Sequence, residues 1–464
     1  MVPPNIVLIL VDDLGWRDLG SQGSTFYETP ILDALAASGM RFTDAYASCP
    51  VCSPSRASIL TGKYPARLGV TNYIGGHARG KLLDAPYIDH LAPEEYSLAR
   101  ALHKRGYATW HVGKWHLGER AFFPDRHGFD VNIGGCGWGF PINGYFSPWG
   151  IETLADRRDG EYLTDRLTDE AVALIRSAGG NPFFLNMWYY AVHVPIQAPA
   201  SLVDKYRSKA RRLGIDRINA FEEGELFPCD HKKHLRVTRR RLQSDPAYAA
   251  MVENLDANVG RILTALEDVG QAQNTLFIFT SDNGGLATAE GSPTCNAPLV
   301  EGKGWMYEGG LRVPLLFRLP GVVPKGSVCT VPVTGPDLYS TVLEAVGPRL
   351  LPEQHQDGVS IWPLLRGGDA LDRNALYWHF PHYGNQGGTP ASAIRMGEYK
   401  LIEYFETGSV ELYNLDADIS EAHDLACEQP EICRKLQGLL REWRDEVGAK
   451  YPQVPGNAHV PSTP

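Results

Sequence analysis

Short apolar runs that end in polar residues recur along the chain. Residues 5–11 and residues 275–281 are mainly apolar; two aspartates follow the first run, and an Asp-Asn pair follows the second. Runs of this length are typical of parallel strands that are buried on both faces of a sheet. Because open α/β sheets bind ligands at the carboxyl ends of their strands, we expect both polar pairs to lie at one functional edge.

Two further runs show the same arrangement. Residues 107–112 are followed by Gly113-Lys114-Trp115-His116, and residues 182–189 are followed shortly afterwards by His193. Taken alone, the first segment is a polar turn with an anchored tryptophan, and a single histidine is usually structural. Their shared position beyond predicted core strands favours a second interpretation, in which they supply a cation and titratable groups to an anion site.

Helical spacing predicts helices between these strands, at residues 30–38, 97–105, 163–176, 247–266 and 337–346. A strand is also predicted at residues 41–47. Beyond residue 368 the pattern changes to short antiparallel strands, at residues 376–380, 393–396, 399–405 and 410–413, and then to a long amphipathic helix at residues 430–448. We therefore predict an α/β fold with a mostly parallel sheet flanked by helices in residues 1–368. A smaller α+β subdomain, with an antiparallel sheet and a long helix, is predicted in residues 369–464.

The composition is that of an ordinary globular protein. The 464 residues are 43% hydrophobic and 21% charged, and no apolar run reaches the length of a membrane span. The net charge of −10 argues against general nucleic-acid binding, so any anion site must be locally positive. The first four residues lack a basic segment, so we expect no signal peptide, and a protein that is either cytoplasmic as written or periplasmic or secreted after removal of a leader.

Residues 201–242 differ from the rest of the chain because they carry two basic clusters. The clusters comprise Lys205, Arg207, Lys209, Arg211 and Arg212, and then Lys232, Lys233, Arg236, Arg239, Arg240 and Arg241. Such clusters can form a track for a polyanionic chain. We favour the alternative, a solvated insertion or a contact between subunits, and the oligomeric state stays open.

The two polar pairs predict a metal site. Asp12, Asp13, Asp282 and Asn283 bring three carboxylates and an amide oxygen to the same predicted sheet edge. Neighbouring carboxylates repel one another unless a cation lies between them, and oxygen ligands of this kind suit Ca²⁺ or Mg²⁺. The chain has no Cys/His pattern that would suggest zinc. A single aspartate could instead cap a helix or turn, but one residue would suffice for that.

A cysteine stands at the start of another predicted helix. Ser53 suits the N-cap and Pro54 suits the first helical position. Cys52 would then lie beside free backbone N–H groups and the positive end of the helix dipole, which favours anions and lowers a thiol pKa. Arg56, on the first turn, adds a planar set of donors suited to an oxyanion. Cys49 and Cys52 also have the spacing of a redox pair, or could be two small buried thiols.

A third interpretation comes from the longer pattern Cys52-x-Pro54-Ser55-Arg56-x-x-x-Leu60-Thr61-Gly62, which resembles the signature of type I sulfatases at every fixed position. Further segments match the same family: the opening Asp-Asp, the Gly-Lys-Trp-His element, the Ser-Asp-Asn-Gly element and the Lys303 segment with Glu308-Gly309-Gly310. The resemblance covers almost the whole chain apart from residues 201–242. It implies an alkaline-phosphatase-like fold.

The resemblance also implies roles for these residues. A maturation enzyme would oxidise Cys52 to formylglycine, whose hydrate is the nucleophile in the family. One Ca²⁺, or alternatively Mg²⁺, would be held by the four oxygen donors together with residue 52. Arg56 and His116 would hold the hydrate and help to deprotonate it. Lys114, His193 and Lys303 would bind sulfate, and His193 or Lys303 would protonate the leaving oxygen.

The substrate is predicted from less specific features. The Gly-rich segment 134–150 carries aromatic residues suited to stacking on a ring, and a second group of polar residues lies late in the chain; the candidates are Trp138, Tyr145, Arg312, His379, His382 and Tyr383. They favour a sulfated carbohydrate cleaved from the end of a glycan, with no nucleic-acid or membrane partner. A general arylsulfatase, a phosphatase or phosphonate monoester hydrolase of the same superfamily, and an unmatured sulfate-binding protein are the alternatives.

Overall fold

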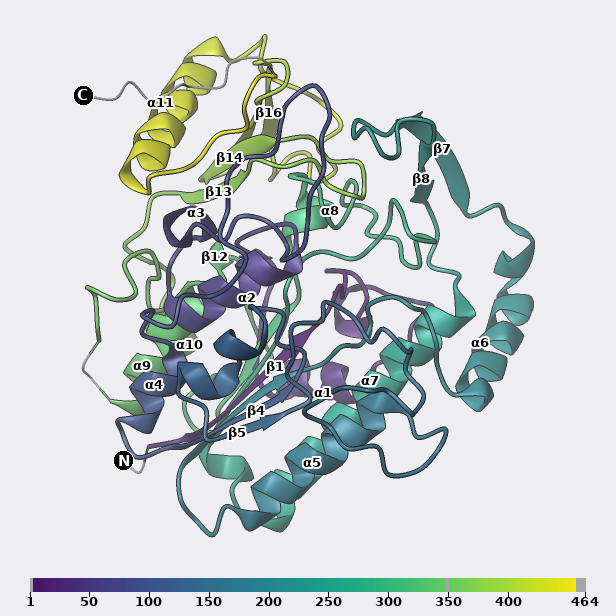
Figure 1. Ribbon diagram of the computed structural model, residues 1–464, viewed down its shortest axis with the longest axis vertical. Coiled ribbons are helices and arrows are strands. Elements are labelled where there is room, and N and C mark those ends of the chain that lie inside the picture. Colours follow the sequence, from purple (N-terminus) through teal and green to yellow (C-terminus); the bar gives the residue numbers. More distant parts are fainter. Residues whose placement is uncertain (1–2, 348–349, 456–464) are drawn as a thin grey trace.

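The computed structural model of the chain describes residues 3–347 and 350–455. Residues 1–2 and 456–464, at the outer ends of the two predicted domains, lie outside the described residues. The signal-peptide prediction rests on the first four residues, of which the first two are therefore not described. Two layers of helices enclose a large sheet, and a smaller sheet with one long helix lies at one end of the molecule (Figure 1).

The main sheet contains eight strands among the described residues, in the order β11-β2-β10-β9-β1-β6-β4-β5. Their bounds in that order are Ser327–Cys329, Met40–Phe42, Leu315–Arg318, Thr275–Ser281, Asn5–Val11, Phe183–Trp188, Ala108–Gly113 and Val131–Ile133. The five neighbouring strands β9, β1, β6, β4 and β5 are all parallel to one another, and β10 is antiparallel to both of its neighbours. Every residue of β1, β6 and β9 is buried, as their apolar runs predict. The mostly parallel sheet predicted from the sequence is therefore confirmed.

The predicted strand at residues 41–47 is wrong in detail, because the chain leaves the main sheet after β2. Ala45–Tyr46 forms a separate strand, β3, which pairs with β12 (Val333–Thr334) in a small parallel sheet. The intervening Thr43 and Asp44 make side-chain hydrogen bonds, and the Thr43 backbone N–H donates to Cys329. This bend carries the chain toward the cysteine-containing helix.

The helices lie in two groups, one on each face of the main sheet (Figure 1). The first group contains α1 (Pro30–Ser38), α5 (Leu163–Ser177), α6 (Ala200–Leu213) and α7 (Pro246–Asp268). The second contains α2 (Cys52–Thr61), α3 (Pro65–Leu68), α4 (Leu98–His103), α9 (Asp337–Val346) and α10 (Trp362–Leu365). The five helices predicted between the strands are all present, with ends that differ by at most two residues. Among the described residues, no helix is both long enough and apolar enough to cross a membrane.

The C-terminal part forms an antiparallel sheet covered by one helix, as predicted. The sheet comprises β13 (Leu376–Phe380), β14 (Ala391–Met396), β15 (Tyr399–Tyr404) and β16 (Val410–Asn414), and the helix is α11 (Pro430–Glu446). Leu436, Leu440 and Trp443 of α11 pack against Ile394 and Leu401 of the sheet. The sheet also contacts the main part of the molecule, where the Trp378 Nε1–H donates to the Ala47 carbonyl at 2.8 Å. The domain limit at residues 368/369 stays a prediction.

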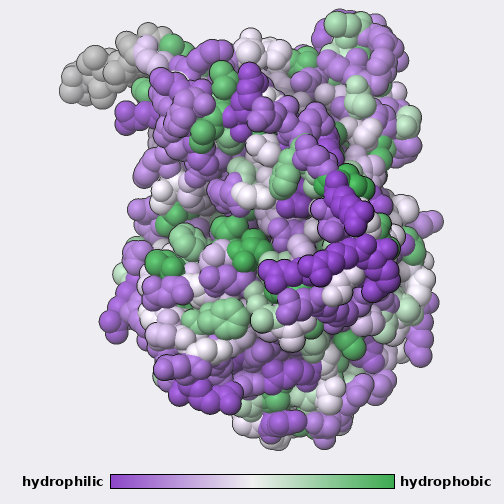
Figure 2. All heavy atoms as spheres, turned by 90° about the vertical axis from the view of Figure 1, so that its right-hand side faces the viewer, coloured by the Kyte–Doolittle hydropathy of each residue, from purple (hydrophilic) through white to green (hydrophobic). Residues whose placement is uncertain are grey.

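The basic insertion forms helix α6 and a hairpin of β7 (Phe221–Leu226) and β8 (Arg236–Arg240) on one side of the molecule (Figure 1). Figure 2 looks onto this side, where hydrophilic residues predominate. Lys205 lies 2.6 Å from Glu28 and 2.7 Å from Glu253, and Arg239 pairs with Glu301 at 2.7 Å. Because neighbouring acids neutralise these basic side chains, the arrangement favours a solvated insertion over a track for a polyanion.

Candidate active site

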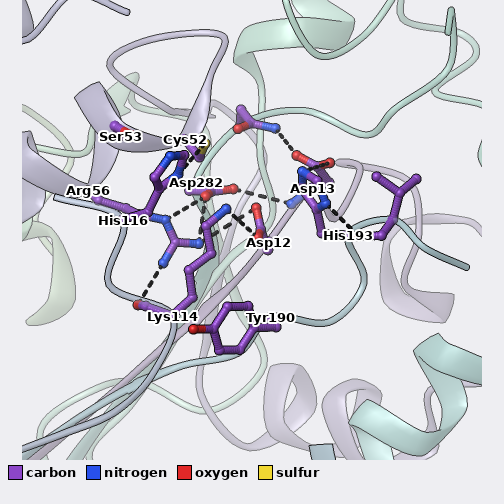
Figure 3. A network of polar contacts seen from close by, with 12 residues as sticks. Asp12, Asp13, Cys52, Ser53, Arg56, Lys114, His116, Tyr190, His193 and Asp282 are labelled. Atoms are coloured by element: carbon purple, nitrogen blue, oxygen red, sulfur yellow. Dashed lines mark hydrogen bonds and ion pairs between the residues drawn. The ribbon is translucent and has the colours of Figure 1, made fainter. Parts of the chain in front are cut away.

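The polar residues predicted to share one sheet edge are brought together by the ends of four adjacent strands, β9, β1, β6 and β4 (Figure 3). Backbone hydrogen bonds tie these ends to one another. The Asp282 N–H donates to the Val11 carbonyl at 3.2 Å, and the Lys114 N–H donates to the Trp188 carbonyl at 2.7 Å. The side chains that follow the strands are therefore held on a rigid frame, as a preorganised site requires.

The cysteine helix begins two residues earlier than its capping pattern predicts. Helix α2 starts at Cys52, and Val51 is its N-cap without a side-chain hydrogen bond. The predicted N-cap, Ser53, instead accepts a hydrogen bond from the Ile74 N–H at 3.1 Å through its Oγ. This contact anchors the segment around Ile74 beside the first turn of the helix. Cys52 still lies at the positive end of the helix, where backbone N–H groups are free.

Cys52 and Cys49 are both buried free thiols. Burial raises the pKa of the Cys49 thiol well above its usual range. A redox cysteine of this spacing has a lowered pKa and an accessible sulfur, so the structure does not support the redox interpretation.

His116 faces the sulfur of Cys52. Its Nδ1 lies 3.3 Å from Cys52 Sγ, and its Nε2 lies 3.1 Å from the Ile74 carbonyl. A carbonyl only accepts, so we assign the ring proton to Nε2, which leaves the Nδ1 lone pair directed at residue 52. Burial and the nearby Lys114 ammonium lower the His116 pKa well below its usual value, so the ring is neutral. His116 also has a positive φ of 55°, an uncommon conformation that is typical of functional sites.

The four oxygen donors lie beside three buried cations. Arg56 donates to Asp282 Oδ2 through Nε at 2.9 Å and through a terminal nitrogen at 2.7 Å. Lys114 Nζ donates to Asp12 at 2.6 Å, and Lys303 Nζ donates to Asp13 at 2.8 Å. Asn283 completes the group by donating to Asp13 through Nδ2 at 2.8 Å.

The buried charges shift one another's pKa values. Burial raises the pKa of Asp12 well above its usual value, although Lys114 opposes this effect. Burial also acts to raise the pKa of Asp13, but the charge of Lys303 and the hydrogen bond from it outweigh burial, and the pKa is lowered. The pKa of Lys303 is raised because Asp13 outweighs the opposing effect of burial. Perturbed groups of this kind cluster at functional sites.

The oxygen donors fit a hard divalent cation. Asp12 Oδ1 and Asn283 Oδ1 are buried and accept no hydrogen bond from the described residues. Buried acceptors without a partner are costly, and two of them beside further carboxylates are accounted for by a cation. Asp12, Asp13 and His193 each have one potential ligand atom in this region, and these three atoms lie within 4.8 Å of one another. The sequence predicts the two aspartates as ligands, but it does not place the histidine with them.

His193 lies between Asp13 and Lys303. Its Nδ1 lies 2.9 Å from the Val194 carbonyl, so we assign the ring proton to Nδ1. Its Nε2 lies 2.9 Å from Lys303 Nζ and 3.5 Å from Asp13 Oδ2. Burial, reinforced by the Lys303 charge, lowers the pKa of His193 to about 3. The neutral ring therefore accepts a hydrogen bond from Lys303.

A family model described as Sulfatase matches residues 4–348 of this sequence. The chain belongs to the sulfatase family. A second model, described as N-sulphoglucosamine sulphohydrolase, C-terminal, matches residues 301–446. The resemblance noted in the sequence is therefore confirmed, and the chain is a sulfuric ester hydrolase of the alkaline phosphatase superfamily.

Individual relatives agree with the family models. A sulfatase from Formosa agariphila is 35% identical and the match covers 95% of this chain and 88% of the relative. The N-acetylgalactosamine-6-sulfatase of Mus musculus is 33% identical, with 91% of this chain and 76% of the relative covered. The crystal structure of Ps i-CgsB in complex with k-i-k-neocarrahexaose superimposes with a TM-score of 0.75 at 30% identity, covering 95% of this chain and 93% of that one.

The aromatic loop of this sulfatase differs from its sequence-based prediction. Tyr145 is fully buried, and its hydroxyl donates to the Tyr190 and His193 carbonyls at 2.7 and 2.9 Å. It therefore supports the His193 segment and cannot stack on a substrate ring. Trp138 is partly buried against the core. The exposed ring at the site is Phe140, which is 44% exposed and stacks nearly parallel on His193 with centroids 6.1 Å apart.

The other substrate candidates are also corrected, because all four side chains are buried and bonded within the protein. His379 lies 2.7 Å from Ser392 Oγ and 2.8 Å from the Lys450 carbonyl. His382 lies 2.5 Å from Asp84 and 2.9 Å from Thr71. The Tyr383 hydroxyl donates to Glu406 at 2.6 Å. Arg312 forms ion pairs with Asp44 and Glu308, the first residue of α8 (Glu308–Leu311).

Two residues of the site were missed from the sequence. Tyr190 lies beside the candidate catalytic residues (Figure 3), and its hydroxyl donates to the Gly134 carbonyl at 2.8 Å. Ile74 offers its backbone N–H to Ser53 and its carbonyl to His116. Tyr190 continues an apolar run and Ile74 acts through its backbone alone, so neither residue carries a signal that the sequence could have revealed.

Proposed function

We propose that this sulfatase hydrolyses the S–O bond of a sulfate ester on a carbohydrate, acting at the end of a glycan chain. The observation that supports a sulfate-ester site best is the convergence of six candidate catalytic residues with four oxygen donors at one buried sheet edge: Cys52, Arg56, Lys114, His116, His193 and Lys303. The carbohydrate assignment is supported by the matches to an N-acetylgalactosamine-6-sulfatase and to a structure in complex with k-i-k-neocarrahexaose.

Residue 52 is the proposed nucleophile, after oxidation of the Cys52 thiol to formylglycine by a maturation enzyme. Formylglycine supplies, in its hydrated form, two hydroxyl groups on one carbon, so that one can attack sulfur while the other allows sulfate to leave. His116 directs its Nδ1 lone pair at this position from 3.3 Å and is placed to accept a proton from residue 52. The Ile74 carbonyl keeps the proton of His116 on the opposite nitrogen.

The proposed metal is one Ca²⁺, with Mg²⁺ as the alternative, held by Asp12, Asp13, Asp282, Asn283 and residue 52. When bound, it supplies a Lewis acid for a sulfate oxygen. The support is the chemistry of the donor set and the two acceptors, Asp12 Oδ1 and Asn283 Oδ1, that lack a hydrogen-bond partner in the described part of the chain. Arg56, which donates twice to Asp282, orients that carboxylate.

Lys114, His193 and Lys303 form the proposed sulfate pocket. The two ammonium groups and Arg56 balance the charges of Asp12, Asp13 and Asp282. A bound divalent cation would therefore leave the site positive in a protein whose net charge is −10, and an anionic group would be attracted to this point. Lys303 carries the proton that His193 lacks, because its pKa is raised by Asp13 against the effect of burial. The pair can therefore deliver a proton to the leaving oxygen, from Lys303 directly or through His193 Nε2.

The test combines two measurements on the purified protein. Mass spectrometry of the tryptic peptide that spans residues 42–56 should show an aldehyde in place of the thiol at residue 52. Steady-state kinetics on N-acetylgalactosamine 6-sulfate, k-i-k-neocarrahexaose, other sulfated sugars and 4-nitrophenyl sulfate should give the highest kcat/KM for a sugar. If the aryl ester is cleaved faster than every sulfated sugar, a general arylsulfatase is the better assignment. Faster cleavage of 4-nitrophenyl phosphate than of the sulfate would instead assign a phosphatase.

A further inference from the structure

A cavity of about 450 Å³ lies between the β7–β8 hairpin of the insertion and the loop that follows β9. Its floor includes Phe227, which is only 6% exposed. Its polar walls carry Glu223, Lys232 and His234 from the insertion and Glu290 from the other side. None of these residues has a part in the catalytic cluster described above.

The cavity adjoins the catalytic site through Glu290. Gln386 donates to Glu290 through Nε2 at 3.2 Å. The same side chain packs on the residue after Lys303, since a Cβ added at Gly304 would lie 2.6 Å from Gln386 Oε1. Gln386 thus connects the Glu290 side of the cavity to the residue that follows Lys303 of the proposed sulfate pocket.

A second connection runs along the other side of the cavity. Lys232 Nζ donates to the Asn385 carbonyl at 2.8 Å, and His231 Nε2 lies 3.0 Å from Asn385 Oδ1. Asn385 in turn donates to the Tyr73 hydroxyl. Tyr73 precedes Ile74, whose carbonyl accepts from His116. The insertion is therefore bonded to the segment that orients the proposed base.

The insertion also fixes the loop that carries Glu290. Ser292 Oγ donates to the Thr238 carbonyl of β8 at 2.8 Å, and the Arg240 N–H of β8 donates to the Ala287 carbonyl at 2.9 Å. Glu290 has a positive φ of 54°, which a glutamate rarely adopts unless the surrounding structure imposes it. The hairpin and the Glu290 loop thus form one wall with a defined shape.

The lining of the cavity suits a sugar ring. Lys232 and His234 offer hydrogen-bond donors, Glu223 and Glu290 offer acceptors, and Leu235, which is 47% exposed, offers an apolar surface. Lys232 is itself held over the Phe227 ring at 5.3 Å. Clefts that combine an apolar floor with a few placed polar groups are typical of small-ligand sites, whereas charges of both signs do not suit a purely anionic ligand.

We propose that this cavity is a second sugar subsite, which binds the residue next to the sulfated terminal sugar of a glycan through its hydroxyl groups. This inference rests on the proposed action on carbohydrates and adds a preference for an oligosaccharide over a monosaccharide. The insertion, which the sequence leaves without a function, then determines substrate length.

The test compares two substrates that differ only in length, a sulfated monosaccharide and an oligosaccharide that ends in the same sulfated sugar. The ratio of their kcat/KM values should favour the oligosaccharide in the wild type. Lys232→Ala and His234→Ala should each lower this ratio by about tenfold, the effect expected from losing a hydrogen bond to a charged group. Lys233→Ala is the matched control, since Lys233 pairs with Asp230 at 3.5 Å outside the cavity and its loss should leave the ratio unchanged.

Calorimetry with the Cys52→Ala variant gives a second readout that needs neither maturation nor turnover. The oligosaccharide should bind more tightly than the monosaccharide, and adding Lys232→Ala should remove the difference. Equal binding of both sugars, or an unchanged ratio in both insertion variants, overturns the subsite while action on carbohydrates stands. A wild type that cleaves 4-nitrophenyl sulfate but no sulfated sugar overturns the carbohydrate function and the subsite together.

Discussion

His116 Nδ1 lies 3.3 Å from Cys52 Sγ, and the ring is held in this orientation by the Ile74 carbonyl on its other nitrogen. The two residues are 64 positions apart in the sequence, yet their side chains meet at the start of α2. The arrangement places a neutral, buried base against the residue whose oxidised form is the proposed nucleophile.

The first prediction distinguishes the two cysteines of the motif. Cys52→Ala should abolish sulfatase turnover because it removes the nucleophile precursor, whereas Cys49→Ala should retain most of it. Cys49 is buried beside Tyr46 and Met306 in a small apolar cluster, so its loss costs packing and stability more than chemistry. Turnover of an aryl sulfate and thermal melting of both variants separate these effects. Equal loss of turnover in two folded variants would contradict the assignment.

The second prediction concerns the metal. Ca²⁺ should raise the melting temperature of the wild type in a saturable way, because an ion that binds only the folded state stabilises it. Asp282→Asn should abolish this shift together with activity, since it removes one carboxylate and weakens the anchor of Arg56. Asp169→Asn, at an acid on the exposed face of α5, is the control and should keep the full shift. Full activity after exhaustive chelation would contradict the metal site.

The third prediction tests proton delivery to the leaving group. His193→Ala should reduce kcat/KM for sugar sulfates by about 10²–10⁴-fold, the usual contribution of general acid catalysis. The loss on 4-nitrophenyl sulfate should be much smaller, because nitrophenolate leaves without protonation. A series of aryl sulfates with leaving groups of increasing pKa should therefore show a steeper dependence in the variant. An equal loss across the series would assign His193 to sulfate binding alone.

Much of the fold and of the candidate catalytic cluster could be predicted from the sequence, because both depend on local pattern. The buried runs that become β1 and β9 identify parallel strands, and the topology of such sheets then places Asp12 and Asp282 at one edge. The strand order was not predictable, because the pairing partners β1 and β9 are separated by more than 260 residues. The start of α2 was mispredicted because Ser53 bonds to Ile74 instead of capping its own helix.

The substrate residues could not be predicted because their environment is set by distant parts of the chain. Tyr145 resembles an exposed loop aromatic, but the carbonyls of Tyr190 and His193 satisfy its hydroxyl within the core. His382 resembles a free donor, but it pairs with Asp84, 298 positions away. A polar side chain can be buried when its polar atoms form hydrogen bonds with other buried groups. These partners are distant in the sequence, so the sequence pattern does not predict them.

The last prediction concerns stability and pH. Asp256 on α7 accepts hydrogen bonds from the Ile31 N–H at 3.1 Å and the Leu32 N–H at 2.8 Å, and thus caps the start of α1 from a different helix. Burial raises its pKa from 3.8 to about 6, even though the two N–H groups act to lower it. Because the folded protein holds this proton more tightly than the unfolded chain, the group contributes stability below pH 3.8 that is lost as the pH rises through about 6.

Asp256→Asn removes this titration but keeps one acceptor for the cap. The difference in unfolding free energy, variant minus wild type, should therefore rise between about pH 4 and pH 7 by on the order of 2 kcal/mol. Urea unfolding across this range measures the difference directly, and other titrating groups cancel because both proteins share them. Asp268→Asn, at the exposed end of the same helix, is the control for an Asp-to-Asn change that removes no helix cap. A difference for Asp256→Asn that stays flat with pH would show that the folded and unfolded states bind this proton equally.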